Sequence, residues 1–448
     1  MNYKKYSDYK PSGIEWVTTI PTHWQVRPLF SVMREREEKN TDNQVTNVLS
    51  LSYGRIIPRD VESNFGLLPE SFTTYQIVNP SNIILRLTDL QNDKRSLRVG
   101  LSRERGIITS AYFCLETSTQ LDAEYAYYLL HSYDISKVFY GLGGGVRQSM
   151  KFEDMKHLPI VCPSLDEQRA VVTFLNRETA KLDALVEKKQ RLIELLQEYR
   201  QALITQAVTK GLDPNVPMKD SGIEWLGEVP AHWDIVAFKR FFDVRDGTHD
   251  TPEYVDPTED TFPLVTSKDV KDGDIDFSDT KHISREDHSK IKARSLVERN
   301  DILMPMIGTI GNPVIVSTDR EFSIKNVALF KTGNDNLLAK FGCYFLSSRT
   351  CQVQFDLQNR GGVQSFVSLD ILRNLKITLP RHKDARTELS QIVDFLDRET
   401  SSINVLIRKI WWQIEKIQEY RQALISAAVT GQIDVRRYTG NEVEVATP

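Results

Sequence analysis

One thirteen-residue stretch occurs twice in this chain, and this duplication constrains the fold more than any other feature. The first copy reads QEYRQALITQAVT from Gln197 to Thr209, and the second reads QEYRQALISAAVT from Gln418 to Thr430. Shorter motifs repeat with it: SGIEW occurs twice, IPTHW returns as VPAHW, and FLNRET returns as FLDRET. Motifs near the front of each copy are 209 residues apart and those near the back are 221 apart, so the second copy is 12 residues longer.

The segments between the repeated motifs differ in sequence but follow the same order. Each copy has an apolar, β-rich segment, at 106–116 and 322–331, followed by a helical pattern at 121–133 and 336–348. A glycine-rich turn and a short strand that ends in proline then complete each copy. We therefore expect two modules with similar scaffolds and divergent interiors.

A long helix is predicted after each module. In the first, Ser164 and Glu167 have the spacing of a capping box, and the next helix-stopping residue is Gly211. This leaves about 46 residues, or roughly 69 Å of helix. The second helix is expected to start near Asp384 and to stop at Gly431, although ARTEL replaces the capping sequence SLDEQ there.

Both predicted helices carry apolar residues at heptad spacing, which is typical of a coiled coil. The first heptad position holds Leu175, Leu182, Lys189, Leu196 and Leu203 in the first helix, and Leu396, Ile403, Ile410, Ile417 and Leu424 in the second. The second position is predicted to hold Leu185, Leu192 and Tyr199, with Leu406 and Tyr420 as equivalents. Equal lengths and matched stripes favour antiparallel pairing of the two helices with each other, and the alternative is that each recruits another chain.

The expected fold class is α+β, with two duplicated α/β modules joined by two long antiparallel coiled-coil helices and related by pseudo-twofold symmetry. The predicted segments are a first module (1–163), a first spacer helix (164–211), a second module (212–382), a second spacer helix (383–433) and a C-terminal tail (434–448). Such a chain has two globular ends on a rigid spacer. A symmetric spacer made of two helices explains why the helical sequence occurs twice.

Bulk composition narrows the class of protein. The net charge is -4 and neither module is strongly basic, so DNA binding would depend on local clusters and shaped polar groups. Four cysteines without CxxC spacing indicate a reducing compartment. The N-terminus lacks an apolar signal core and no run of eighteen apolar residues exists, so a soluble, cytoplasmic protein without membrane contact is expected.

Catalytic and metal-binding motifs are scarce in the sequence. There is no GxxxxGK[ST] loop, and the eight histidines show no metal-ligand spacing. The NPSN stretch at 79–82 lacks the second proline and the aromatic residue of an amino-methyltransferase motif. His23 and His232 hold matched positions in the PxHW repeat, where a scaffold role is favoured. We therefore expect no catalytic residue, no metal ligand and no cofactor in this chain.

Taken together, the repeated motifs resemble those of the specificity subunits of type I restriction–modification systems. The resemblance covers essentially the whole chain and is carried by the duplicated SGIEW…PxHW segments and by the EQRAVVTFLNRET…QEYRQALITQAVT helix. In the second module, DGTHDTP at 246–252, together with FPLVTSKDV and GTIGNPVIV, resembles the target-recognition modules of that family.

The resemblance implies a division of labour among subunits. Each module would read one half of a split double-stranded DNA target, and the helices would fix the distance between halves about one helical turn (~34–36 Å) apart. Two methyltransferase subunits, which use S-adenosylmethionine, would bind this non-catalytic chain, and restriction-translocase subunits would join that core. The alternative is a coiled-coil scaffold that holds two protein partners without meeting DNA, while the missing motifs disfavour an active methyltransferase.

Candidate DNA contacts come from cationic and polar residues near predicted turns. The stretch KRSLRVGLSRER at 94–105 carries five cations, and phosphate contacts usually come from such clusters, although a solvated surface loop is the alternative. Resemblance mainly supports the candidates in the second module. The full set is Lys94, Arg95, Arg98, Arg103, Arg105, Arg147 and Gln148 in the first module, and Thr248, His249, Lys268, Lys325, Arg360 and Gln364 in the second.

An aromatic pair on the second helix, Trp411 and Trp412, is a candidate partner interface. Both residues lie off the apolar stripe if Ile410 faces the partner helix. Exposed aromatic pairs often mark interfaces. We expect them to dock a methyltransferase subunit or the adjoining module, and the alternative is packing against a module of this chain.

Overall fold

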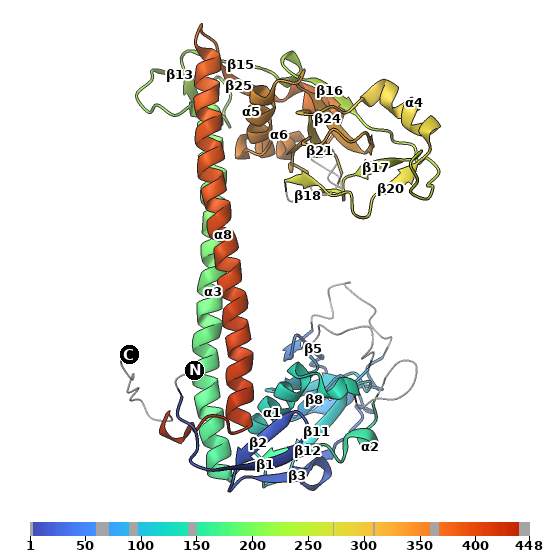
Figure 1. Ribbon diagram of the computed structural model, residues 1–448, viewed down its shortest axis with the longest axis vertical. Coiled ribbons are helices and arrows are strands. Elements are labelled where there is room, and N and C mark those ends of the chain that lie inside the picture. Colours follow the sequence, from blue (N-terminus) through green and yellow to red (C-terminus); the bar gives the residue numbers. More distant parts are fainter. Residues whose placement is uncertain are drawn as a thin grey trace. The chain divides into compact units, whose positions relative to one another are not determined.

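The computed structural model describes residues 3–59, 71–88, 97–141, 150–271, 273–307, 310–358 and 367–438. The chain divides into two compact units, residues 1–189 with 412–448 and residues 190–411. Each unit combines one globular module with part of each long helix (Figure 1). Among the helices in these described ranges, none has the length and hydropathy that a bilayer crossing requires.

The first unit contains the first module. Its strands are β1 (Tyr9–Ile14), β2 (Val17–Pro21), β3 (Gln25–Pro28), β4 (Met33–Glu35), β5 (Leu49–Ser52), β6 (Arg55–Pro58), β7 (Gln76–Val78), β8 (Ile83–Leu85), β9 (Val99–Leu101), β10 (Gly106–Ile108), β11 (Phe113–Thr117) and β12 (Pro159–Cys162). Its helical elements are α1 (Ala123–Ile135), α2 (Phe152–Met155) and the 3-10 turns η1 (Leu29–Ser31) and η2 (Val138–Gly141), with η4 (Arg436–Tyr438) near the C-terminus.

The second unit contains the second module. Its strands are β13 (Met218–Asp220), β14 (Glu228–Pro230), β15 (Trp233–Ala237), β16 (Asp243–Asp246), β17 (Phe262–Thr266), β18 (Val270–Lys271), β19 (Asp274–Ile275), β20 (Lys281–Ile283), β21 (Ile302–Pro305), β22 (Val314–Ile315), β23 (Ser323–Lys325), β24 (Val327–Lys331) and β25 (Lys376–Pro380). Its helical elements are η3 (Phe238–Arg240), α4 (Arg285–Ser295), α5 (Asn336–Leu346), α6 (Arg349–Gln358) and α7 (Leu369–Asn374).

The two modules share a topology. Each has a four-stranded antiparallel sheet, in the order β4-β11-β8-β9 in the first module and β16-β24-β21-β22 in the second. Each also pairs an early strand with its last strand, β3 with β12 and β15 with β25. The modules diverge beyond this frame, because β10 pairs with β7 in antiparallel orientation whereas β23 pairs with β17 in parallel. The predicted duplication with divergent interiors is therefore confirmed.

The two long helices are α3 (Leu165–Lys210) and α8 (Ala385–Val429). Each ends before a glycine in the left-handed region, Gly211 and Gly431, both at φ 71°. A residue with a side chain is strained in this conformation, which is common just after a helix C-terminus. The helix lengths and both stop residues predicted from the sequence are confirmed.

Two polar contacts, one in each unit, show that α3 and α8 pair in antiparallel orientation. In the second unit, Arg200 Nη1 of α3 donates to Asn404 Oδ1 of α8 at 2.8 Å. In the first unit, Arg421 Nε of α8 lies 3.1 Å from Asp183 Oδ1 of α3. The two pairs are equivalent because a shift of 221 residues turns Arg200 into Arg421 and Asp183 into Asn404. The same contact is thus made once in each unit with the helices exchanged.

The second heptad position predicted from the sequence is wrong by one residue. Leu185 and Tyr199 are 42% and 56% exposed, and Leu192, Leu406 and Tyr420 are also exposed. The inward positions are instead Thr179, Val186, Ile193, Arg200 and Ala207 in α3, and Thr400, Ile407, Ile414, Arg421 and Ala428 in α8. Heptad spacing allows a step of either three or four residues from Leu182, and in the structure the step of four, to the half-buried Val186, is the inward one.

Each module packs around the start of one long helix and the end of the other. The first core joins Phe174 near the start of α3 to Leu424 and Val429 near the end of α8. The second core joins Leu396 near the start of α8 to Val208 near the end of α3. Burial of these core side chains against the helices fixes each module to its part of the helix pair.

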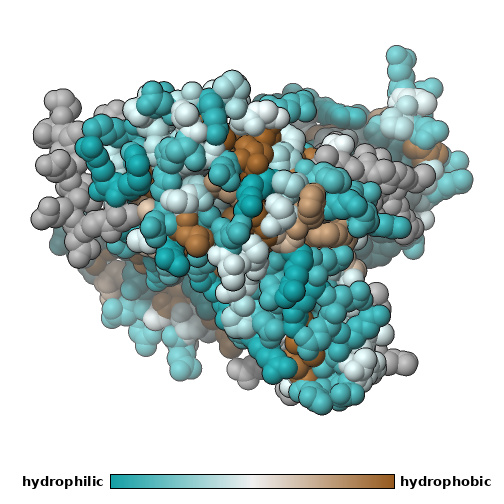
Figure 2. All heavy atoms as spheres, turned by 90° about the horizontal axis from the view of Figure 1, so that it is seen from below, coloured by the Kyte–Doolittle hydropathy of each residue, from teal (hydrophilic) through white to brown (hydrophobic). Residues whose placement is uncertain are grey.

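On the face of the molecule shown in Figure 2, hydrophilic residues predominate and hydrophobic groups are small and separate.

Candidate nucleic-acid interface

The loop that follows β16 lies against the junction of β23 and β24 in the second module. The backbone N–H of Thr248 donates to Ile324 O at 2.9 Å, and that of Asn326 donates to Thr248 O at 3.3 Å. The approach depends on Gly247, because a Cβ at this position would lie 2.1 Å from the carbonyl oxygen of Ile324. Asn326 adopts φ 55°, which bends the chain between the two strands.

Exposed polar side chains gather on this loop. His249 Nε2 lies 2.8 Å from Asp246 Oδ2, and His249 Nδ1 lies 3.0 Å from Asn326 Oδ1. Arg294 of α4 donates to Asp246 Oδ1 at 2.6 Å. Lys325 Nζ donates to Thr251 Oγ1. We call the residues Asp246, Thr248, His249, Thr251, Lys325 and Asn326 the β16-loop cluster.

The structure brings together four of the six residues that sequence reasoning selected in the second module. Thr248, His249 and Lys325 belong to the β16-loop cluster. Exposed Lys268 follows Ser267, whose hydroxyl donates to Asn326 O at 3.1 Å. Hydroxyl, amide, imidazole and ammonium groups are the types that bind phosphates and base edges.

Sequence reasoning missed three residues that shape this cluster. Asp246 and Arg294 hold the loop through an ion pair, and Asn326 contacts both His249 and the strand junction. Asn326 carried a usable signal, because an asparagine inside the β-rich segment 322–331 is typical of a left-handed turn. Arg294 carried none, since it lies on a helix distant in sequence.

In the first module, Arg98 is a correction to the predicted cationic surface. Its side chain is 0% exposed. Arg98 Nη1 donates to the carbonyl oxygens of Arg86 and Thr88, at 3.1 and 2.8 Å, and Nε donates to the Tyr140 hydroxyl at 3.1 Å. A buried guanidinium is tolerated only when its donors are satisfied in this way. Arg98 therefore stabilises the module and presents no charge at its surface.

Arg103 and Arg105 are exposed in the turn between β9 and β10. Arg103 forms an ion pair with Glu124 at the start of α1. Asn47 Nδ2 donates to the carbonyl oxygen of Arg105 at 3.1 Å and so anchors the turn. These two side chains are the cations of the 94–105 stretch that the structure places at the surface. The other candidates, Lys94, Arg95, Arg147, Gln148, Arg360 and Gln364, lie outside the described residues.

The aromatic pair on α8 faces away from the helix stripe. Ile410 is buried, whereas Trp411 and Trp412 are 51% and 59% exposed. The prediction that both tryptophans lie off the stripe is confirmed. Their partner remains a prediction.

A carboxylate at the start of each long helix connects that helix to the PxHW repeat of its module. Glu167 Oε1 lies 2.8 Å from His23 Nε2 and accepts the indole N–H of Trp24 at 3.3 Å. Ser164 Oγ donates to the other carboxylate oxygen at 3.1 Å. Burial alone would raise the pKa of the Glu167 carboxyl, but these hydrogen bonds outweigh burial and hold that pKa below its usual range.

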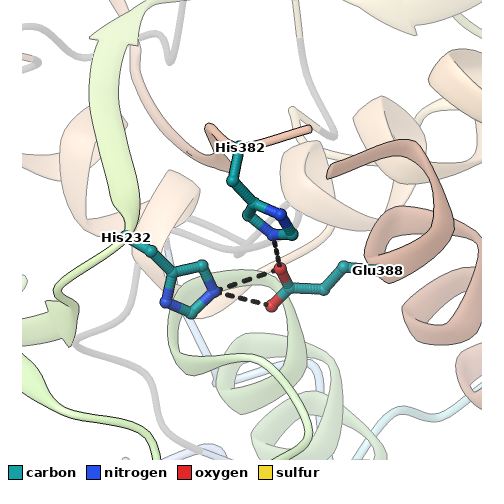
Figure 3. Close-up of side chains that lie close together, drawn as sticks. All are labelled: His232, His382 and Glu388. Atoms are coloured by element: carbon teal, nitrogen blue, oxygen red, sulfur yellow. Dashed lines mark hydrogen bonds and ion pairs between the residues drawn. The ribbon is translucent and has the colours of Figure 1, made fainter. Parts of the chain in front are cut away.

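The equivalent carboxylate in the second unit, Glu388, has an additional histidine. His232 Nε2 lies 3.2 and 3.1 Å from its two oxygens, and Trp233 Nε1 donates to Oε1 at 3.0 Å. His382 Nε2 lies 2.8 Å from Oε2 (Figure 3). Burial raises the pKa of the Glu388 carboxyl, but the hydrogen bonds from His382, Trp233 and His232 outweigh it and lower that pKa. Spacing in the sequence gave no metal-ligand set, yet the fold brings together three residues that could hold a metal ion.

Another histidine, His288, resembles a catalytic base only in its contacts. Its Nδ1 lies 2.9 Å from Ser323 Oγ, and its Nε2 lies 3.3 Å from Glu321 Oε2. Both His288 and Ser323 are buried, and the ring of Phe262 stacks on the imidazole at 3.9 Å between centroids. A substrate therefore has no access to this hydroxyl, and the contacts stabilise the module.

Known proteins with similar sequences are specificity subunits of type I restriction enzymes. The specificity subunit of the type I restriction enzyme MjaVIII from Methanocaldococcus jannaschii is 22% identical over 426 residues, which cover 93% of this chain and 94% of the relative. The EcoBI specificity subunit from Escherichia coli is 24% identical over 277 residues, covering 60% of this chain and 57% of its own length. No protein-family model matches the chain.

A solved structure supports the fold. It is described as the "structural basis underlying complex assembly and conformational transition of the type I R-M system" and aligns with a TM-score of 0.59 at 16% identity. The alignment covers 92% of this chain and 99% of the solved chain. The resemblance indicated by the repeated motifs is thus confirmed, and over nearly its full length the chain is similar to the specificity subunits of type I restriction enzymes.

Proposed function

We propose that this chain is the DNA-specificity subunit of a type I restriction–modification complex and acts in the cytoplasm. Each module reads one half of a bipartite, asymmetric DNA target, and the helix pair holds the two readings at a fixed spacing. The chain performs no catalysis. Two methyltransferase subunits that use S-adenosylmethionine bind to it, and restriction-translocase subunits join the assembly.

One observation carries this proposal: two modules of one topology, with different surface chemistry, are attached to a helix pair in equivalent ways. Glu167 and Glu388, each bound to the His-Trp pair of its own module, show the equivalence of the attachments. Equivalent attachment with different modules suits a target whose two halves differ in sequence. A symmetric protein would instead match a palindromic target.

The β16-loop cluster supports direct reading of DNA by the second module. Lys325 and Lys268 supply positive charge for phosphates, whereas Thr248 and His249 present donors and acceptors of the kind that pair with base edges. The ion pair of Asp246 with Arg294 holds the loop in one conformation, which favours specific over adaptable contacts. In the first module, the turn that carries Arg103 and Arg105 is the candidate for DNA contact.

The exposed faces of the helices support the docking of partner subunits. Trp411 and Trp412 combine large exposed area with positions outside the helix–helix stripe. Tryptophans of this kind are enriched among residues that dominate binding energy at protein interfaces. We assign the pair to the methyltransferase contact.

Methylation mapping tests the proposed function. The chain is co-expressed with its methyltransferase subunit in a host that lacks DNA methylation, and modified bases are located across the genome. A split motif with a fixed unspecified gap is the expected result. A stable complex that methylates no defined motif would contradict the DNA-reading role and favour a scaffold for two protein partners.

A further inference from the structure

Three side chains in the second unit converge around one point. His232 lies just before β15, His382 lies in the short connection between β25 and α8, and Glu388 lies in the first turn of α8. One potential ligand atom from each residue lies within 4.8 Å of the others. Figure 3 shows both imidazole rings directing their Nε2 atoms at the carboxylate. Donors in a tetrahedral zinc site, with bonds of about 2.1 Å, are about 3.4 Å apart. The imidazole–carboxylate distances of 2.8 to 3.2 Å therefore open slightly when an ion enters, which small shifts of the three side chains allow.

The first unit contains the equivalent histidine and glutamate, but His382, the third potential ligand, has no equivalent there. His23 and Glu167 correspond to His232 and Glu388, but the other carboxylate oxygen of Glu167 accepts from the hydroxyl of Ser164, and the Tyr6 hydroxyl donates to the first oxygen at 3.4 Å. His382 lies in a four-residue insertion, 381–384, because the paired strands β3–β12 and β15–β25 align Cys162 with Leu379 whereas the helices align Glu167 with Glu388. The scaffold contact is therefore common to both units, and the convergence of three metal-binding side chains belongs to the second.

The surroundings of the three side chains favour a cation. They line an open cavity of about 560 Å³, together with two further acidic residues, Asp213 and Asp384. The indole N–H of Trp233 donates to Glu388 Oε1 at 3.0 Å and so orients the carboxylate from outside the group. Partners that orient ligands in this manner are a regular feature of metal sites. The open side of the cavity leaves room for a water molecule as a fourth ligand.

We propose that His232, His382 and Glu388 form a binding site for a divalent transition-metal ion of the zinc class. Two imidazoles and one carboxylate are a donor set that zinc accepts, with a further position open to water. The ion ties the start of α8 to the connection after β25 and to the PxHW repeat, so it reinforces the attachment of the second module to its helix. This inference goes beyond the proposed DNA-reading function and does not depend on it.

Metal binding requires one rearrangement at His382. In the metal-free chain the backbone N–H of Asp384 donates to His382 Nδ1 at 3.1 Å, which leaves the ring proton on Nε2. A metal ion needs the lone pair of Nε2, so the proton moves to Nδ1 and the bond from Asp384 is given up. The ion thus replaces one backbone hydrogen bond and the two imidazole–carboxylate contacts.

The test uses the full-length chain without a histidine tag, after treatment with a chelator and removal of that chelator. Calorimetric titration with Zn²⁺ is expected to show one equivalent bound with micromolar or tighter affinity, and bound Co²⁺ is expected to give the visible absorption of a low-coordinate site. Saturation with Zn²⁺ is expected to raise the Tm of the second unit by about 5 °C, since a ligand that binds only the folded state stabilises it.

Two variants separate a metal site from a structural contact. His382→Ala removes the third ligand and keeps the His232–Glu388 contact, so it is expected to weaken Zn²⁺ binding at least 100-fold while helix content stays unchanged. His23→Ala removes the matched histidine of the first unit and is expected to leave Zn²⁺ affinity unaltered. A wild-type chain that binds no Zn²⁺ at tens of micromolar, or a His382→Ala chain that binds it as well as wild type, overturns the proposal. Neither outcome bears on DNA reading, because no DNA or partner is present.

Discussion

Glu167 and Glu388 hold equivalent positions at the starts of α3 and α8, and each accepts hydrogen bonds from a His-Trp pair of its own module. The third partner differs, being the hydroxyl of Ser164 in the first unit and the imidazole of His382 in the second. The same contrast holds for the sheets, where the central order is shared and the peripheral pairing is not. Contacts that attach a module to the helices are therefore preserved between the copies, whereas residues outside the attachment differ in chemistry.

The largest expected effect on this comparison comes from removing the indole rings that attach the modules to the long helices. Trp24 and Trp233 are fully buried in equivalent places, so Trp24→Ala and Trp233→Ala are each expected to lower the free energy of unfolding of their unit by about 3–5 kcal/mol. Hydrogen exchange of each unit measures the loss. Trp412→Ala, at an exposed site, is the matched control and is expected to change stability by less than about 0.5 kcal/mol. Unequal losses for the two buried residues would break the proposed equivalence.

A second prediction concerns the divergent part of the second module. Gly247→Ala places a Cβ against the carbonyl of Ile324 at 2.1 Å, so the backbone must move. We expect a loss of about 3 kcal/mol in unfolding free energy, the upper end for an overpacked site, together with displacement of the β16-loop cluster. Among the described residues, no atom lies within 4 Å of the methyl group that Gly141→Ala adds, so this variant serves as the control for denaturant unfolding. Similar behaviour of the two variants would show that the close approach is not required.

A third prediction compares equivalent positions on α1 and α5. His131 and Tyr344 lie equally far after the capping residues Asp122 and Asp335. Burial, with a contribution from Arg421, lowers the pKa of His131 to about 4. The unfolded chain binds this proton near pH 6.5, so the folded state loses stability as the pH falls from about 6.5 to about 4.

The expected cost to the first unit is about 2 kcal/mol between pH 7.5 and pH 5. His131→Phe should abolish this part of the pH dependence in denaturant unfolding. Tyr344→Phe loses a hydrogen bond to Asp397, worth about 1 kcal/mol, at both pH values because the hydroxyl does not titrate in this range. A pH dependence that survives in His131→Phe would assign the acid sensitivity to other groups.

The sequence predicted the duplicated modules and the long helices better than it predicted which residues lie at the surface. Duplicated motifs, heptads and the glycines at 211 and 431 define the helices, because helix ends and coiled-coil stripes have strong local signals. The second stripe was ambiguous, since Leu185 and Val186 are both apolar. Arg200 was not recognisable as an inward residue, because its burial depends on Asn404, which is distant in sequence.

The candidate site was predictable in part for similar reasons. The DGTHDTP stretch led to the β16-loop cluster through resemblance, and the fold places Lys325 in this cluster and Lys268 beside it. Charge counting failed at Arg98, because a cation in a basic stretch appears exposed until the segment that leads into β9 is known to be buried. The convergence of His382 with Glu388 depends on the path of a four-residue insertion, which composition and spacing do not reveal.

Module-specific methylation maps test whether the two modules read their half-sites independently. Three complexes are compared: wild type, a His249→Ala/Lys325→Gln variant of the second module, and an Arg103→Gln/Arg105→Gln variant of the first. If the modules read independently, each variant is expected to lose or relax sequence preference in one half of the split motif, with the gap and the other half unchanged. The two variants must affect opposite halves. Loss in the same half, or equal changes in both halves from one variant, would contradict the account.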